Sequence, residues 1–191
     1  MPGKILKYSF LILLFLSAGY GVYEFWLKYR LSDSSLPYLY DMNSEKLDSS
    51  VKADKVIVFK SERKMMLLRN GDTIKTYRIS LGGNPLGHKE MEGDSKTPEG
   101  KYILDWRNPN SKYHLSLHVS YPNDKDINKA KEKGVSPGGD IMVHGCPNGL
   151  GWNWQYYKAN DWTDGCIAVS DSEIEEIWNA VIDGTEIEIF P

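Results

Sequence analysis

Short stretches in which apolar and polar residues alternate, or in which β-branched residues cluster, recur from residue 55 to the end of the chain. Both patterns predict β-strands. The stretches are residues 55–59, 64–69, 72–79, 101–106, 115–120, 140–144 and 185–190. Asn70-Gly71 separates the second stretch from the third, and Asn-Gly is a strong signal for a two-residue hairpin turn. We therefore expect the folded part of the chain to open as antiparallel sheet.

One stretch near the C-terminus has a helical pattern instead. Ser170 and Glu173 have the spacing of a capping box. Apolar residues then recur on one helix face, namely Ile174, Ile177, Trp178 and Val181. Asp183-Gly184 ends the predicted helix. Many short strands with one or two helices, and no regular alternation of strand and helix, predict a mostly β fold with mainly antiparallel strands.

Length and charge narrow the class of protein. A chain of 191 residues fits one ordinary domain with a short extension. The net charge of −3 is uneven, because the first 30 residues carry four Lys or Arg side chains and one Glu, which leaves −6 on the rest. A folded part with this net negative charge lacks the excess of Lys and Arg side chains that displaces counterions from nucleic-acid phosphates. The composition therefore argues against nucleic acid as a partner.

The N-terminus has the pattern of an export signal. An uncharged, mostly apolar run over residues 8–23 follows Lys4 and Lys7, and apolar residues extend it to Leu27. We expect residues 1–30 to anchor the chain in the cytoplasmic membrane, with the folded domain outside. Cleavage after small residues near Ala18 is the alternative, which would release a secreted protein. Residues 31–53 are polar and predict a linker, which leaves residues 54–191 as the domain.

The residues that most strongly indicate catalytic chemistry lie between Met142 and Val169, just before the predicted helix. His144-Gly145 ends one strand, and Cys166 follows 22 positions after His144 in the sequence Thr163-Asp164-Gly165-Cys166. A thiol in a loop that leads to a helix start is a candidate nucleophile, because helix N–H groups and a nearby imidazolium both favour the thiolate. His144 is the natural proton acceptor, since an unperturbed imidazole has a pKa of about 6.5.

Two other interpretations of these residues stay open at this point. Cys146 and Cys166 are the only cysteines, and an exported chain permits a disulfide between them. A zinc site drawn from His114, His118, His144 and the cysteines is less favoured, because no tight metal-ligand spacing is present. His114 and His118 are four residues apart on a predicted strand, which separates them by roughly 13 Å.

The motifs together resemble the L,D-transpeptidase catalytic domain family (YkuD-like) of bacterial cell-wall enzymes. His144-Gly145 and the Thr163-x-Gly165-Cys166 signature carry the resemblance, together with an upstream run over residues 82–100 that ends in Lys96-Thr-Pro-Glu-Gly100. The resemblance covers roughly residues 56–190. It implies a β-sandwich-like catalytic domain that acts on peptidoglycan stem peptides and needs neither a metal nor an organic cofactor.

The resemblance also implies residue roles. Cys166 would be the nucleophile, His144 its general base, and Gly165 the glycine that lets the chain approach the substrate. Thr163, Asp164, Gly145 and His118 are then candidates for substrate contact. These seven residues form the predicted site.

The chain departs from the family pattern at three positions. Asp164 stands where the family commonly has a second His, and Ala168 stands where it commonly has Arg or Asn. These two departures put the choice of donor substrate in doubt more than the reaction. Cys146 is not expected from the pattern, and it would be either a chance substitution or a redox partner that protects Cys166.

The reaction that the family implies is a two-step acyl transfer. The Cys166 thiolate attacks the carbonyl after the third residue of a tetrapeptide stem, expels the terminal D-alanine and holds the rest as a thioester. An acceptor amine then resolves the thioester in a transpeptidase, whereas water would make the protein an L,D-carboxypeptidase or an amidase. The competing hypothesis is an inactive, membrane-tethered module that binds the cell wall.

Overall fold

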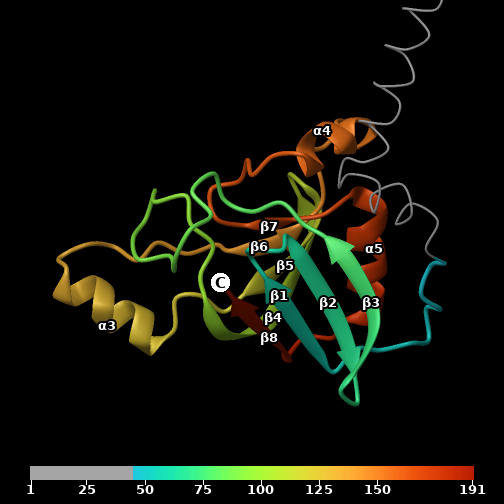
Figure 1. Cartoon of the computed structure of the whole chain (residues 1–191), viewed down its shortest axis with the longest axis horizontal. Coiled ribbons are helices and arrows are strands. Elements are labelled where there is room, and N and C mark those ends of the chain that lie inside the picture. The colour runs from blue at the N-terminus through green and yellow to red at the C-terminus, as the bar shows by residue number, and fades with distance from the viewer. Residues whose placement is uncertain (1–44) are drawn as a thin grey trace, which may run out of the picture. The chain divides into compact units, whose positions relative to one another are not determined.

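The structure is a computed structural model that describes residues 45–191. The predicted anchor and most of the predicted linker lie outside the described residues, so both stay predictions. Within the described part, no helix is both long enough and apolar enough to cross a bilayer. Residues from Leu47 to Pro191 form one unit, whose centre is a single mixed sheet of eight strands (Figure 1).

The strands lie in the order β3-β2-β1-β8-β4-β5-β6-β7. Their bounds are β1 Lys55–Phe59, β2 Lys64–Arg69, β3 Asp72–Arg78, β4 Gly100–Ser111, β5 His114–Val119, β6 Met142–His144, β7 Ile167–Ala168 and β8 Thr185–Phe190. The helices are α3 Asp124–Glu132, the 3₁₀ helix η1 Gly151–Asn153, α4 Trp154–Lys158 and α5 Asp171–Ala180. All seven predicted strands are present, and β7 is additional.

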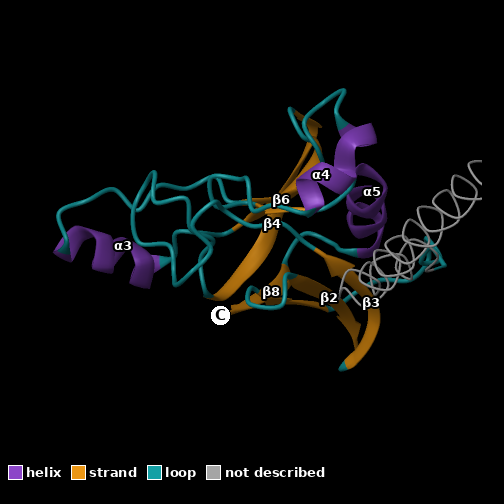
Figure 2. Ribbon diagram, turned by 45° about the horizontal axis from the view of Figure 1, so that its top comes forward, coloured by secondary structure: helices purple, strands orange, loops and turns teal. Residues whose placement is uncertain are grey.

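The sheet curls until its two edge strands come together. The chain that follows β3 runs beside β7, where Ser80 and Ala168 exchange two backbone hydrogen bonds of 2.9 Å. Gly82 pairs with Thr163 a short way farther along. Because β3 and β7 are the outer strands of the sheet order, these contacts bend the sheet around a single interior. Figure 2 shows this curvature, with α4 and α5 at one end of the domain and α3 at the other.

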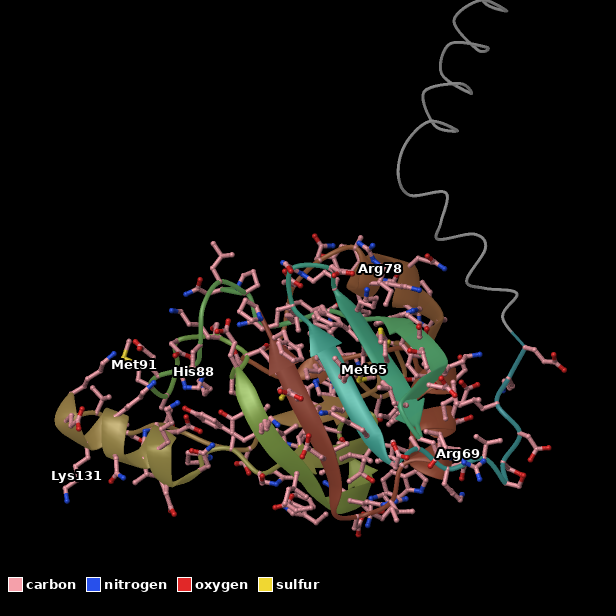
Figure 3. All side chains as sticks on the ribbon, turned by 60° about the horizontal axis from the view of Figure 1, so that its bottom comes forward. Met65, Arg69, Arg78, His88, Met91 and Lys131 are labelled. Carbon is pink, nitrogen blue, oxygen red and sulfur yellow. The ribbon has the colours of Figure 1, made fainter. Side chains whose placement is uncertain are left out.

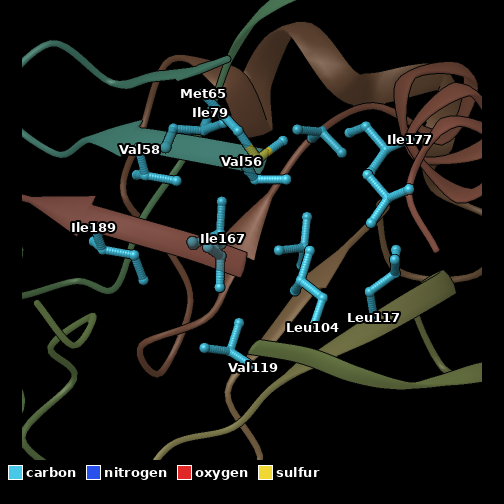
Figure 4. Packing of buried hydrophobic residues seen from close by; sticks show 14 of the residues in the cluster. Val56, Val58, Met65, Ile79, Leu104, Leu117, Val119, Ile167, Ile177 and Ile189 are labelled. Atoms are coloured by element: carbon cyan, nitrogen blue, oxygen red, sulfur yellow. The ribbon is translucent and has the colours of Figure 1, made fainter. Parts of the chain in front are cut away.

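The core fills the interior of the curled sheet and extends to one face of α5. Figure 4 shows Ile167 of β7 between Val58 and Ile189 on one side and Leu104 and Val119 on the other. All five side chains are at most 2% exposed. The alternating strand patterns therefore point their apolar residues into one shared core.

The predicted helix is α5, and it begins as its sequence indicates. The Ser170 side chain accepts from the Glu173 N–H while the Glu173 carboxylate accepts from the Ser170 N–H. The helix ends at Ala180, three residues before the expected Asp183-Gly184. Ile174 and Ile177 pack into the core.

Two further α-helices bring the described total to three, beyond the one or two expected. α3 has a capping box of its own, formed by Asn123 and Asp126, but it buries only Asp126 and Ala130, so no apolar stripe predicts it. His88 Nε2 lies 3.1 Å from Asp126 Oδ1, which ties the loop over residues 82–99 to this helix. Figure 3 shows His88 and Met91 beside α3.

Candidate active site

The strand register brings the predicted nucleophile and two histidines to one face of the sheet. His118 of β5 pairs with Met142 of β6, and the Met142 N–H donates to Cys166 Sγ over 3.4 Å. In the neighbouring row, Ser116 pairs with His144, and His144 pairs with Ala168 of β7. Side chains two positions apart on a strand share a face. His118, His144 and Cys166 therefore project from the same face, which is opposite to the core.

His144 is buried beneath aromatic rings. The Tyr113 ring centre lies 4.5 Å from the imidazole centre, and the Trp162 ring lies edge-on at 5.7 Å. Nδ1 is 2.7 Å from the Gly145 carbonyl oxygen, which can only accept a hydrogen bond. The proton of the neutral ring is therefore on Nδ1, and Nε2 keeps a free electron pair. Burial lowers the pKa of His144 to about 4, so the ring is neutral at pH 7.

Cys166 is half-buried, and its thiol donates to the Asp140 carbonyl oxygen over 3.6 Å. Burial raises the pKa of Cys166, the acidic Asp164 and Asp140 raise it further, and the Met142 N–H opposes them. The resting pair is thus a thiol and a neutral imidazole. The sequence had favoured a thiolate near a helix start, but β7 separates Cys166 from α5.

The turn before Cys166 is held by its own threonine. Thr163 Oγ1 donates to the Cys166 carbonyl over 2.7 Å and accepts from the Gly165 N–H at 3.2 Å. Gly165 has φ +122°, and a Cβ at this position would lie 2.5 Å from the Lys96 carbonyl oxygen. Only glycine fits here without moving the backbone. The buried Thr163 and Gly165 therefore fix the path of the chain into Cys166.

The other predicted site residues lie in different surroundings. Asp164 is exposed, two residues before Cys166. Gly145 is buried, and a Cβ there would lie 2.7 Å from Asp171 Oδ1 and 3.0 Å from His114 Cβ, so its link to the site is the carbonyl that holds His144. His118 is half-buried and pairs with Asp105, with 2.7 Å between Nδ1 and Oδ1.

Both cysteines are free, so the disulfide that the sequence left open is absent from the structure. Cys146 is fully buried, and that burial raises the pKa of its thiol to about 12. Its backbone N–H donates to Asp171 Oδ1 over 2.8 Å. Between residues 45 and 191, no three or more His, Cys, Asp or Glu side chains are grouped as ligands for a metal ion.

Sequence reasoning missed several residues that contact the predicted site residues. Tyr113 and Trp162 cover His144, Asp105 holds His118, and the Lys96 carbonyl packs against Gly165. Lys96 belongs to the upstream run that carried the family resemblance, which was a usable signal. The other three have no local sequence pattern that marks them, because their roles come from contacts between distant segments.

Comparison with known proteins identifies the family of the domain. The family described as the L,D-transpeptidase catalytic domain, YkuD, matches residues 53–189 of the chain. The putative L,D-transpeptidase YafK of Escherichia coli K12 is 29% identical over 131 residues, which are 65% of this chain and 45% of YafK. The chain therefore spans less than half the length of this curated relative.

Solved structures with similar folds include two proteins from other bacteria. The helical cell shape determining protein Pgp2 of Campylobacter jejuni superposes with a TM-score of 0.56 at 25% identity, over 73% of this chain and 48% of Pgp2. Bd1075 of Bdellovibrio bacteriovorus superposes with a TM-score of 0.50 at 24% identity, over 76% of this chain and 50% of Bd1075.

Proposed function

The chain belongs to the YkuD family of L,D-transpeptidase catalytic domains, and we propose that it is a peptidoglycan L,D-transpeptidase whose nucleophile is Cys166. The observation that carries this proposal is the register of β5, β6 and β7. It presents a thiol and a neutral imidazole on one sheet face, in adjacent rows of a parallel strand pair. From the strand spacing and the rise per residue, the Cα atoms of His144 and Cys166 are about 8 Å apart, within reach of their two side chains.

Acylation begins from neutral partners. His144 Nε2 takes the thiol proton while Sγ attacks the carbonyl carbon after the third residue of a tetrapeptide stem. The C–N bond to the terminal D-alanine then breaks, and the His144 imidazolium returns the proton to the departing amine. The dry surroundings of His144 support this role, because they keep the ring unprotonated until the thiol delivers its proton.

The oxyanion needs backbone donors near Sγ. Thr163 already occupies the Gly165 N–H, whereas no group of residues 45–191 accepts a hydrogen bond from the Cys166 N–H. We assign the Cys166 N–H as one donor to the developing oxyanion. Thr163 and Gly145 support the site through the turn and through His144, and we assign the exposed Asp164 a contact with substrate.

The membrane anchor and the orientation of the domain belong to the same proposal. Peptidoglycan lies outside the cytoplasmic membrane, and the basic, then apolar, N-terminal sequence fits an anchor that leaves the domain on that side. Fractionation with N-terminal sequencing tests this. Recovery of the full-length chain in the membrane supports the anchor, and a soluble species that begins near residue 20 overturns it.

The proposed activity is tested on the soluble domain, residues 47–191, with purified disaccharide-tetrapeptide muropeptides and mass spectrometry. Loss of D-alanine together with a cross-linked product supports transpeptidation. A tripeptide product alone assigns water as the acceptor and makes the protein a carboxypeptidase. Unchanged muropeptides with a titratable Cys166 thiol overturn the proposal in favour of an inactive wall-binding module.

A further inference from the structure

A second histidine with a carboxylate partner stands in the same row as the nucleophile. His118 Nδ1 is 2.7 Å from Asp105 Oδ1, and the Trp106 ring stacks on the imidazole with 4.9 Å between ring centres and 18° between planes. The side chains of His118 and Asp105 are 14% and 40% exposed. The imidazole is therefore held on one edge and one face, yet it remains open to solvent.

The held edge fixes which nitrogen is available. A carboxylate can only accept, so the neutral His118 ring carries its proton on Nδ1 and has a free electron pair on Nε2. Within residues 45–191, no protein group forms a hydrogen bond with Nε2. A carboxylate that orients an imidazole in this way is the arrangement that general bases use. His144 has only a backbone carbonyl in the corresponding place.

The distance between His118 and Cys166 along this row suits a reaction centre that lies between their two side chains. His118 and Cys166 flank Met142 on adjacent strands, so their Cα atoms are about 10 Å apart at two strand spacings. A thioester carbon on Sγ, an attacking nitrogen and a hydrogen bond from that nitrogen to an imidazole together span roughly 8 Å. The acyl group and the acceptor that attacks it would therefore bridge the row over Met142, whose side chain projects from the same face.

We propose that His118, positioned by Asp105, is the base that serves the acceptor in the second half of the reaction. The neutral acceptor amine forms a bond to the thioester carbonyl carbon and passes one proton to His118 Nε2. The C–Sγ bond breaks with its electron pair on Sγ, and the thiolate regains a proton from the His118 imidazolium through solvent. His144 serves the donor half, and His118 serves the acceptor half.

This inference rests on the proposed function, and intact-protein mass spectrometry separates the two. The soluble domain, residues 47–191, is mixed with disaccharide-tetrapeptide as donor and acceptor, and the acyl-enzyme is followed with time. For His118→Gln we expect acylation at the wild-type rate, accumulation of the acyl-enzyme, and transfer slowed by roughly 10²-fold. Asp105→Asn should show the same pattern more weakly, because it misplaces the base without removing it.

Hydroxylamine provides a readout that a structural role of His118 would not produce. The ammonium that forms when its nitrogen attacks is acidic enough to lose its proton to water, so hydroxylamine should discharge the accumulated acyl-enzyme of His118→Gln at close to the wild-type rate. His114→Gln is the matched control. His114 lies on the same strand and face and also pairs with a carboxylate, Glu175 at 2.8 Å, but it does not flank the nucleophile.

Each outcome decides the matter. Accumulation of acyl-enzyme that hydroxylamine relieves supports the assignment of His118. An equal loss of acylation in His118→Gln, or transfer at the wild-type rate in both variants, overturns it while leaving the proposed function intact. Absence of both acyl-enzyme and released D-alanine with the wild-type protein overturns the proposed function itself. Circular dichroism on each variant shows that the fold is retained, and Asp105→Asn supplies the test if His118→Gln does not fold.

Discussion

Two halves of the sheet, which β4 joins, are held together in different ways. The first half, here called the ladder half, consists of β1, β2, β3 and β8. Within it, β1 pairs at five positions with β2 and at five with β8. In the site half, β5, β6 and β7, strand β7 pairs at only two positions with β6. The remaining hydrogen bonds of β7 come from Ser80, in the loop after β3. The ladder half is held by longer runs of strand pairing, whereas the site half has short runs that turns and single contacts supplement.

The difference teaches where this fold can carry reactive groups. The outer face of these short strands carries the polar side chains His118, His144 and Cys166, and loop residues such as Tyr113 and Trp162 cover part of it. The inner face of the same strands still carries Leu117, which is buried in the shared core. The site half therefore gains its rigidity from the common core and its chemistry from the opposite face. Four predictions test this separation of stability and chemistry.

The largest effect is expected from Cys166, the proposed nucleophile. Cys166→Ala should lower turnover of muropeptides by about 10⁴-fold or more, because the covalent route is lost, while the melting temperature changes little. Cys146→Ser, assayed under reducing conditions, should retain most of the activity. The two cysteines are matched in chemistry and differ in their place on the sheet. Equal inactivity of Cys146→Ser would show that the assignment of a single nucleophile is wrong.

A substitution in the ladder half should act in the opposite way. Leu67 is fully buried opposite Val56, so Leu67→Ala should lower the free energy of unfolding by roughly 2–5 kcal/mol. Activity per folded molecule should not change, because the site half keeps its contacts. Urea denaturation and turnover below the transition measure both quantities. Thr76→Ala, at an exposed position of β3, is the control, with an expected change within about 0.5 kcal/mol.

Alanine substitutions at one glycine of each half should give a smaller but more specific difference in activity. In Gly165→Ala the new Cβ would lie 2.5 Å from the Lys96 carbonyl, so the turn must move and displace Cys166. A misplacement of this kind costs roughly 10²-fold in turnover. Gly71→Ala is the control, because its φ of +87° imposes similar backbone strain but no atom lies within 4 Å of the new Cβ. Similar activities of the two variants would contradict a positioning role for Gly165.

The same contrast explains what could be predicted from the sequence. The hairpin around Asn70-Gly71 and the cap at Ser170 are local signals, since each depends on residues close together in the chain, and both appear in the structure. β7 escaped prediction because two residues are too few to form a pattern. α3 escaped because it buries almost nothing apolar, although its capping residues Asn123 and Asp126 are a readable signal.

The same distinction between local signals and long-range contacts applies to the candidate site. Cys166 and His144 belong to motifs that a reader of the sequence can find, and the strand register places them on one face. The protonation state of each could not be predicted, because it depends on burial beneath Tyr113 and Trp162 and on carbonyls and carboxylates from other loops. Local sequence thus marks candidate reactive groups, and long-range packing sets their charge.

The smallest predicted effect concerns that charge, and it appears in the pH dependence of stability. The pKa of His144 is lowered to about 4 in the folded state, against about 6.5 for an unfolded chain. Between pH 6.5 and pH 4, His144 is therefore mostly protonated in the unfolded state and mostly neutral in the folded state. The stabilisation is complete above pH 6.5 and is lost as the pH falls toward 4, by about 2 kcal/mol at pH 5.

Titrating carboxylates also destabilise the fold in this range, so the wild-type curve alone does not isolate His144. His144→Gln has no titratable ring but the same carboxylates, and its free energy of unfolding between pH 7 and pH 5 should fall less steeply by that amount. Urea denaturation of both proteins at each pH measures the difference, and parallel curves would mean that His144 carries a proton in the folded state and is not the dry base that the site half requires.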